Sequence, residues 1–240
     1  MKLIVCENYD EMSRKAADLV AEIIKENPKA KLGLATGSSP EGMYAELVND
    51  YQEGKIDFAE VSSINLDEYV GIDPENPQSY QYFMNYHLFD KVNIDKNNTN
   101  LPKEYENLNE ATEKYNDLLD KFGTRDLQVL GIGPNGHIAF NEPADKLNMR
   151  TSIIDLSPET IKANSRFFDS EEDVPKQALS MGMADAFDAK TLLVLASGKA
   201  KHEAINKLVS TDKLDPQFPA SFLALHNNCY LIVDKEAYEG

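Results

Sequence analysis

Apolar and polar residues along the chain form two alternating kinds of segment. Short, mostly apolar runs, typical of buried β-strands, occur at residues 2–6, 31–35, 61–66, 127–132, 151–156, 191–196 and 229–233. The longer segments between them carry apolar residues at helical spacing, as in residues 12–24, which Asn27 and Pro28 terminate. Further predicted helices begin at Pro40, Ser79, Leu108 and Lys199.

Strand runs that are apolar throughout, rather than at every second position, are buried on both faces of a sheet. Their alternation with helices predicts an α/β fold, with one open, mostly parallel sheet and helices on both faces, as in Rossmann-like proteins. No stretch of the chain has the composition of a linker, and no repeat of fixed period occurs. We therefore expect residues 1–240 to form a single domain.

The composition argues against several classes of partner. A net charge of −17 disfavours nucleic acid, whose phosphates a protein neutralises with lysine and arginine. No apolar run approaches the roughly 20 residues that span a bilayer, and the apolar N-terminus is too short for a signal peptide. Cys6 and Cys229 are the only cysteines, too few for a disulfide framework. These features predict a cytoplasmic protein with neither nucleic acid nor membrane as a partner.

Open α/β sheets bind ligands in the crevice beyond the carboxyl ends of their strands. The loops that follow the predicted strands are therefore the candidate sites for chemistry. Four of these loops have unusual compositions, and they span residues 36–40, 67–77, 131–143 and 197–199.

Two of these loops suit an anion. Gly37, Ser38 and Ser39 can present N–H groups and hydroxyls at a helix start, where the helix dipole favours negative charge. Lys199 stands at a second such junction, where the dipole disfavours a cation unless an anion is bound. Arg166 could add a two-pronged contact. An N-cap turn, a solvated lysine and a surface salt bridge are the alternatives, but together the residues predict a phosphate site.

The segment NLDEYVG, residues 65–71, ends a predicted strand with the adjacent carboxylates Asp67 and Glu68. A solvated acidic loop is one explanation in a chain with 41 acidic residues. If Asp67 instead projects into a dry crevice, burial raises its pKa from about 4 toward neutral pH, where it can abstract a proton. We predict that Asp67 is a catalytic base.

The loop GIGPNGHIAFNEP, residues 131–143, combines glycines and prolines with His137 and Glu142. His137 can act as an acid or a base near neutral pH, and a turned loop can bring Glu142 back to orient it. Asn135 adds an amide that can hydrogen-bond to either residue. A structural histidine in a tight loop is the alternative. A metal site is not indicated, because the chain has no HExxH motif and no cysteine cluster.

Assembled in order, these segments resemble the glucosamine-6-phosphate deaminases, a family of amino-sugar catabolic enzymes. The resemblance covers nearly the whole chain, through TGSSP, NLDEYVG, GIGPNGHIAFNEP, ANSRFF and the Lys199 junction. The string GHIAFNEP is specific, since the related phosphogluconolactonases have a similar Gly-His loop that continues without Phe-Asn-Glu-Pro.

The resemblance implies conversion of glucosamine 6-phosphate and water to fructose 6-phosphate and ammonia, with no metal or organic cofactor. It also implies that His137 opens the sugar ring with help from Glu142 and Asn135, and that Asp67 moves the C2 proton to C1 through an enolamine. The resulting ketimine or carbinolamine then loses ammonia to water. The residues that match positions associated with the phosphate are Ser38, Ser39, Arg166 and Lys199.

Two departures from the family pattern concern charge. Many members have aspartate where this chain has Asn135, so we expect ring opening to survive with a different pH dependence.

Allosteric hexamers of the family bind N-acetylglucosamine 6-phosphate through a serine and an Arg-x-Lys-Thr segment. This chain has Asp145 in place of the serine, and Ser152, Ile154 and Asp155 in place of the arginine, lysine and threonine. The site thus loses two cations and gains two carboxylates, which would repel the phosphate of the activator. We therefore predict a non-allosteric enzyme, a monomer or small homo-oligomer.

Two other functions stay open on these residues. A related sugar-phosphate lactonase or an amino-sugar isomerase would use similar loops, and ammonia release separates them from a deaminase. A sugar-phosphate sensor domain of a transcriptional regulator can share this kind of fold. That alternative needs a basic helix-turn-helix, whereas the chain begins with a strand and is acidic throughout.

Overall fold

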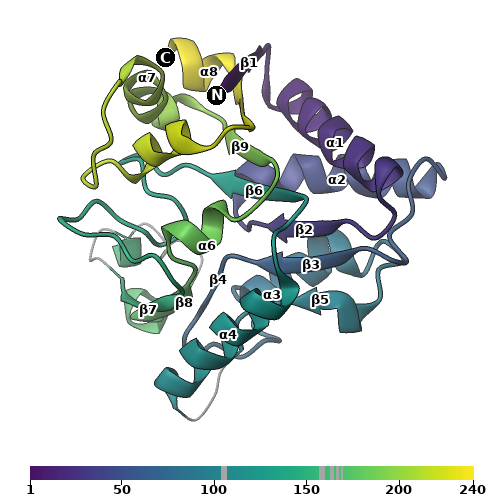
Figure 1. Ribbon diagram of the computed structural model, residues 1–240, viewed down its shortest axis with the longest axis horizontal. Coiled ribbons are helices and arrows are strands. Elements are labelled where there is room, and N and C mark those ends of the chain that lie inside the picture. The colour runs from purple at the N-terminus through teal and green to yellow at the C-terminus, as the bar shows by residue number, and fades with distance from the viewer. Residues whose placement is uncertain (104–106, 157–159, 163–164, 166–167, 169) are drawn as a thin grey trace.

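Seven parallel strands form the central sheet of the molecule (Figure 1). The computed structural model describes every residue except 104–106, 157–159, 163–164, 166–167 and 169. The strand order is β1-β10-β9-β6-β2-β3-β5, and every neighbouring pair is parallel, as predicted. The strands are Lys2–Cys6 (β1), Lys31–Leu34 (β2), Ser62–Asn65 (β3), Thr99–Asn100 (β5), Leu127–Gly131 (β6), Leu192–Ala196 (β9) and Cys229–Asp234 (β10).

Both faces of this sheet are covered. Every residue of β9 is buried, although successive side chains of a strand point to opposite faces. Among the residues described, no helix has the length and apolar character to cross a bilayer. The helices are α1 (Tyr9–Glu26), α2 (Ser38–Gln52), α3 (Tyr80–Met84), α4 (Leu108–Phe122), α6 (Met183–Phe187), α7 (His202–Ser210) and α8 (Lys235–Glu239). Shorter turns are η1 (Asn85–Phe89, π-helical), η2 (Lys96–Asn98), η4 (Glu171–Asp173), η5 (Lys199–Lys201) and η6 (Pro219–Leu225).

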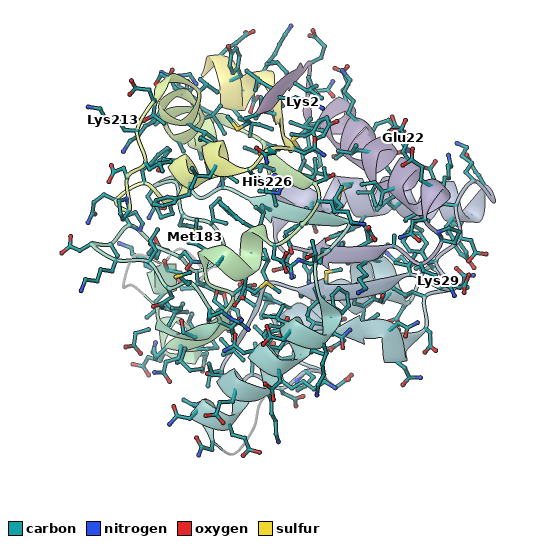
Figure 2. All side chains as sticks on the ribbon, in the orientation of Figure 1. Lys2, Glu22, Lys29, Met183, Lys213 and His226 are labelled. Atoms are coloured by element: carbon teal, nitrogen blue, oxygen red, sulfur yellow. The ribbon has the colours of Figure 1, made fainter. Side chains whose placement is uncertain are left out.

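The first helix illustrates how the sequence sets these elements. The Asn8 side chain accepts a hydrogen bond from the Glu11 N–H at 2.9 Å and caps the start of α1. Met12 and Val20 lie on its buried face, and α1 contacts β1, β9 and β10. Glu22 is exposed and projects from the outside of the molecule (Figure 2). The apolar stripe thus attaches the helix to the sheet, and the polar stripe faces solvent.

A second, three-stranded antiparallel sheet consists of β4 (Asp67–Tyr69), β8 (Gln177–Ser180) and β7 (Ser152–Asp155), in that order. The sequence did not indicate this sheet, and segment 151–156 pairs here instead of joining the parallel sheet. Only one residue separates β3 from β4, so the chain passes directly from the large sheet into the small one. The apolar cluster beside the small sheet contains Tyr69, Ile72, Phe140, Leu156 and Ala178.

The strand order brings the four candidate loops together. β9, β6, β2 and β3 are neighbours in the sheet and run parallel. The loops that follow them therefore leave from the same edge, the carboxyl edge at which open α/β sheets bind ligands.

Candidate active site

A cavity of about 530 Å³ lies at this edge, and residues from three of the four loops line it, together with Lys201 just beyond the fourth. Ser38 comes from the start of α2, Asp67 from β4, His137 and Glu142 from the loop after β6, and Lys201 from the segment after β9. The predicted base, the predicted proton relay and the predicted anion loop therefore share one site.

His137 and Glu142 form a pair that the Asn135 amide bridges. His137 Nδ1 lies 2.8 Å from Asn135 Oδ1 and 3.4 Å from Glu142 Oε1. Asn135 Nδ2 donates to Glu142 Oε2 at 2.7 Å, and Thr160 Oγ1 donates to Glu142 Oε1 at 3.0 Å. With Nδ1 oriented in this way, Nε2 is the ring nitrogen that can exchange a proton with a ligand.

Glu142 is held as a carboxylate. Burial acts to raise its pKa, but the hydrogen bond and charge of His137, with hydrogen bonds from Asn135 and Thr160, outweigh burial and lower the pKa to about 2. Glu142 is therefore ionised throughout the neutral range. Glu142 thus places a fixed negative charge beside His137, the type of residue that can carry a proton between two substrate atoms.

Glycines make room for this pair. A Cβ added to Gly133 would lie 2.2 Å from Nδ1 and Cε1 of His137, so the ring fills the space of the missing side chain. The Gly133 N–H donates to the His137 carbonyl at 3.0 Å and closes the turn. Gly136 has a φ of 84°, in the left-handed region that favours glycine. The position of His137 thus explains the glycine at position 133, and the left-handed backbone explains the one at 136.

Asp67 and Glu68 are adjacent in β4 but meet different surroundings. Glu68 accepts hydrogen bonds from the N–H groups of Tyr69, Tyr80 and Gln81 at 2.9–3.0 Å, so it caps the start of α3. Asp67 lines the cavity and is 8% exposed. Burial, and then the charge of Glu68, raises the pKa of Asp67 to about 8. Glu68 thus supports the fold, while Asp67 has the pKa of a base that works near neutral pH.

The predicted anion loop lies at the start of α2, and Gly37, Ser38 and Ser39 all line the cavity. Gly37 has a φ of 103°, which only glycine adopts readily. Tyr9, which the sequence did not indicate, donates from its hydroxyl to the Ser38 carbonyl and accepts from the Gly42 N–H, each at 2.7 Å. Tyr9 thereby fixes the first turn of α2 against α1, with its N–H groups and hydroxyls next to the cavity.

The segment after β9 brings to the cavity a different lysine from the one the sequence predicted. Lys199 is exposed and does not line the cavity, whereas Lys201, at the other end of η5, does. The buried Asp234 carboxylate accepts from the Gly198 N–H at 3.0 and 3.1 Å and fixes the start of this turn. Arg166, the other predicted phosphate ligand, lies outside the described residues.

A parallel α/β sheet whose carboxyl edge carries an anion loop, a buried base and a His–Glu pair defines a class of enzymes that act on small phosphorylated molecules. The family described as glucosamine-6-phosphate isomerases/6-phosphogluconolactonase has a model that matches residues 7–231. The chain therefore belongs to this family.

Two relatives that are similar over nearly the whole chain are deaminases rather than lactonases. The chain is 50% identical over 238 residues to a glucosamine-6-phosphate deaminase of Clostridium perfringens (strain SM101), covering 99% of this chain and 98% of the relative. A glucosamine-6-phosphate deaminase of Thermoanaerobacter sp. (strain X514) is 48% identical, covering 99% and 94%.

Solved structures agree with these relatives. A structure described as a monomeric glucosamine-6-phosphate deaminase matches with a TM-score of 0.95 at 40% identity, covering 99% of this chain and 98% of that one. A 6-phosphogluconolactonase from Thermotoga maritima matches with a TM-score of 0.76 at 21% identity, covering 98% and 99%. At that identity the lactonase shares the fold alone.

Proposed function

We propose that the protein is a cytoplasmic glucosamine-6-phosphate deaminase of amino-sugar catabolism. It converts glucosamine 6-phosphate and water to fructose 6-phosphate and ammonia. The observation that carries this proposal is the placement of Asp67 and the His137–Glu142 pair in one cavity with the anion loop 37–39. The identity of 50% and 48% to deaminases over 99% of the chain supports it.

The phosphate binds at the anion loop and at Lys201. Within the described part of the chain, Lys201 is the one lysine or arginine that lines the cavity, and three acidic side chains line it as well. A phosphate dianion is therefore favoured only where the lysine and the loop 37–39 can reach it. Lys199, which does not line the cavity, and Arg166, which lies outside the described residues, stay predictions from the sequence.

His137 opens the pyranose ring. Its Nε2 takes the proton of the O1 hydroxyl and delivers a proton to the ring oxygen, so that C1 becomes an aldehyde. Asn135 and Glu142 hold Nδ1 during both transfers. The carboxylate of Glu142 stabilises the imidazolium that exists between them.

Asp67 carries out the isomerisation, first as a base and then as an acid. Its carboxylate takes the proton from C2 of the open-chain aldehyde while a proton of the substrate's ammonium group moves to O1, which gives an enolamine, and Asp67 then returns its own proton to C1. C2 is then a ketimine. Water adds to C2, and the carbinolamine expels ammonia and leaves the ketone of fructose 6-phosphate. These steps transfer protons and water only, so they require no metal or organic cofactor.

The raised pKa of Asp67 fits this role. A pKa of about 8 makes its carboxylate a stronger base than that of an exposed aspartate. The substrate has a protonated amino group on C2, the carbon from which Asp67 takes the proton. This positive charge favours the ionised form of the Asp67 carboxyl group. Ionisation of Asp67 at neutral pH is therefore coupled to substrate binding.

The protein acts on this small molecule as a monomer or a small homo-oligomer. One observation supports this part of the proposal. The solved relative with a TM-score of 0.95 is described as monomeric.

The test is an assay of both products from glucosamine 6-phosphate. We expect ammonia and fructose 6-phosphate in equal amounts, and much less of either from glucosamine without its phosphate. Galactosamine 6-phosphate and 6-phosphogluconolactone serve as comparison substrates. Faster hydrolysis of the lactone, or a ketose product formed without ammonia, would overturn the proposal.

A further inference from the structure

A second pair of titratable side chains lines the same cavity and has no role in the steps above. His87 Nε2 lies 3.2 Å from Glu41 Oε1, and both residues line the cavity. Glu41 belongs to the first turn of α2, and His87 belongs to the π-helix η1 that continues α3. Their side chains are 42% and 23% exposed, which leaves both accessible to a ligand.

The π-helix directs His87 toward α2. Its ring packs against that of Phe83, four residues earlier, with centroids 4.3 Å apart, and Phe83 also lines the cavity. π-Helical turns are rare and occur frequently at functional sites. A contact that only joined α2 to η1 would have no need of a place on the cavity wall, so the position of the pair points to the ligand.

Glu41 places a carboxylate beside the phosphate end of the cavity. It follows Ser38 by three residues in α2, and side chains at this spacing share a helix face, with Cβ atoms about 5–6 Å apart. Both residues line the cavity. A phosphate bound at Ser38 is therefore within range of the charge of Glu41, and the two like charges repel one another. Tight binding of the phosphate requires that this charge be offset.

We propose that His87 is a proton-linked ligand of the phosphate end: it takes up a proton when the phosphate dianion binds, and the imidazolium offsets Glu41. The proton comes from solvent and is released when the product leaves. The inference rests on the proposed function, because it takes the ligand to be a hexosamine 6-phosphate bound at the loop 37–39.

The charges that act on His87 fit this coupling. Among the described residues, Glu41 faces it from α2, and Lys91 acts from just beyond the end of its own helix. Burial lowers the pKa of His87, Glu41 raises it and Lys91 lowers it, and the net pKa lies below that of an ordinary histidine. His87 is therefore mostly neutral at pH 7 before the ligand arrives, and an incoming dianion favours the imidazolium.

Calorimetry with glucitol 6-phosphate tests the proposal without turnover. This ligand carries the phosphate but has no aldehyde to react and no amino group to change the ionisation of Asp67. Titrations at pH about 6, 7 and 8, in two buffers of different ionisation enthalpy, give the affinity and the number of protons taken up. His87→Gln is the informative variant, because a glutamine amide can still donate to Glu41 but cannot take up a proton.

We expect wild type to take up protons near pH 7 and to lose about tenfold more affinity than His87→Gln between pH about 6 and 8. The ionisation of the ligand's own phosphate is the same for both proteins and cancels in this comparison. Glu41→Gln removes the repulsion, so it should bind more tightly than wild type at pH about 8 and take up fewer protons near pH 7.

Glu46→Gln is the matched control, since Glu46 lies on the same helix, pairs with Arg14 at 2.7 Å and does not line the cavity. It should bind as wild type does. The inference would be overturned if His87→Gln showed the pH dependence and proton uptake of wild type. If His87→Gln does not fold, the same result in Glu41→Gln would overturn it. A wild type that takes up protons with glucitol 6-phosphate but makes no fructose 6-phosphate would support the coupling and overturn the proposed function.

Discussion

The imidazole of His137 occupies the space that a side chain at Gly133 would fill, since a Cβ there would lie 2.2 Å from Nδ1 and Cε1 and 2.5 Å from Cγ. Nδ1 is also the atom that Asn135 and Glu142 orient. The ring is therefore positioned from two sides, by hydrogen bonds and by the missing side chain. A change at Gly133 should act on catalysis through His137.

Gly133→Ala should lower kcat by roughly 10²-fold, the loss expected when a catalytic group moves by about 1 Å. KM should change less, because the anion loop belongs to a different element. The φ of Gly133 is not positive, so alanine is allowed there and the effect is steric. Steady-state kinetics and Tm are the measurements. A folded Gly133→Ala protein with normal kcat would show that His137 does not need its present position.

The candidate residues could be found from the sequence because each follows a strand with a clear apolar run. Asp67 and the loops 37–39 and 131–143 all stand at predicted strand ends, and the rule for open α/β sheets places such ends at the ligand. The order β9-β6-β2-β3, which makes these loops neighbours, was not predicted. Local patterns carry little information about which strands pair.

The features that the sequence missed depend on contacts between distant segments. β4 has only three residues, two of them acidic, and it is a strand because β8 pairs with it. Glu68 acts as a cap only because the start of α3 lies against it. Lys201, rather than Lys199, reaches the cavity because η5 turns the chain after Gly198, and the length of a turn cannot be deduced from composition.

Asp67→Asn should lower kcat by roughly 10²–10⁴-fold, the loss typical of removing a general base. It should also abolish exchange of the C2 hydrogen of the substrate with solvent, which NMR in deuterated water follows directly. Asparagine has nearly the same shape as aspartate, so ligand binding should persist. A normal affinity would show that the site of the variant is intact. Near-normal exchange in this variant would remove Asp67 from the mechanism.

The same substitution should change how stability depends on pH. The pKa of Asp67 is about 8 in the folded protein and 3.8 ordinarily. Below pH about 4 the group is protonated in both states and has no effect. As pH rises toward 8, the unfolded chain ionises first, so the wild-type free energy of unfolding falls by an amount on the order of a few kcal/mol. The free energy of unfolding of Asp67→Asn does not fall in this way, because asparagine does not ionise.

Denaturant unfolding at pH about 3.5 and about 8.5 measures the difference. The variant should match wild type at the lower pH and be the more stable protein at the higher pH. Equal stability of the two proteins at both pH values would mean that the pKa of Asp67 is not raised in the folded state.

Asn135→Asp should move the acid limb of the pH–rate profile to higher pH. The substitution replaces the amide donor, 2.7 Å from Glu142 Oε2, with a second carboxylate oxygen. Two carboxylates at this distance do not both stay ionised without a cost, so the pKa of Glu142 should rise from about 2. The profile of kcat/KM against pH is the measurement. An acid limb at the wild-type position would indicate that Asn135 and Glu142 are not in contact in the working enzyme.

Lys201→Ala should raise KM for glucosamine 6-phosphate by roughly 10–100-fold, because a charge-assisted contact contributes about 1.5–3 kcal/mol. A fall in kcat should accompany it if the phosphate contact also positions the sugar. Lys199→Ala is the matched control from the same turn and should leave KM close to wild type. The opposite ranking of the two variants would make Lys199 the phosphate ligand, as the resemblance implied.

The residues at the allosteric positions of the family already have partners of their own. Asp145 Oδ1 accepts from Gln217 Nε2 at 3.0 Å, and Asp155 Oδ1 accepts from Gln177 Nε2 at 2.7 Å. Both aspartates are exposed and carry negative charge where an activator phosphate would need cations. At both positions the chain thus presents a carboxylate, which disfavours an activator that carries a phosphate.

We therefore expect hyperbolic saturation with glucosamine 6-phosphate and no response to N-acetylglucosamine 6-phosphate. Allostery requires an effector with different affinities for two global states, and an effector that does not bind has no such difference. The measurement is velocity against substrate, with and without N-acetylglucosamine 6-phosphate, at a protein concentration where the oligomeric state is known from light scattering. Competitive inhibition at the cavity is compatible with this prediction, because the compound carries the same phosphate. A sigmoidal curve that becomes hyperbolic when N-acetylglucosamine 6-phosphate is added would show that the surface at Asp145 and Asp155 binds an activator after all.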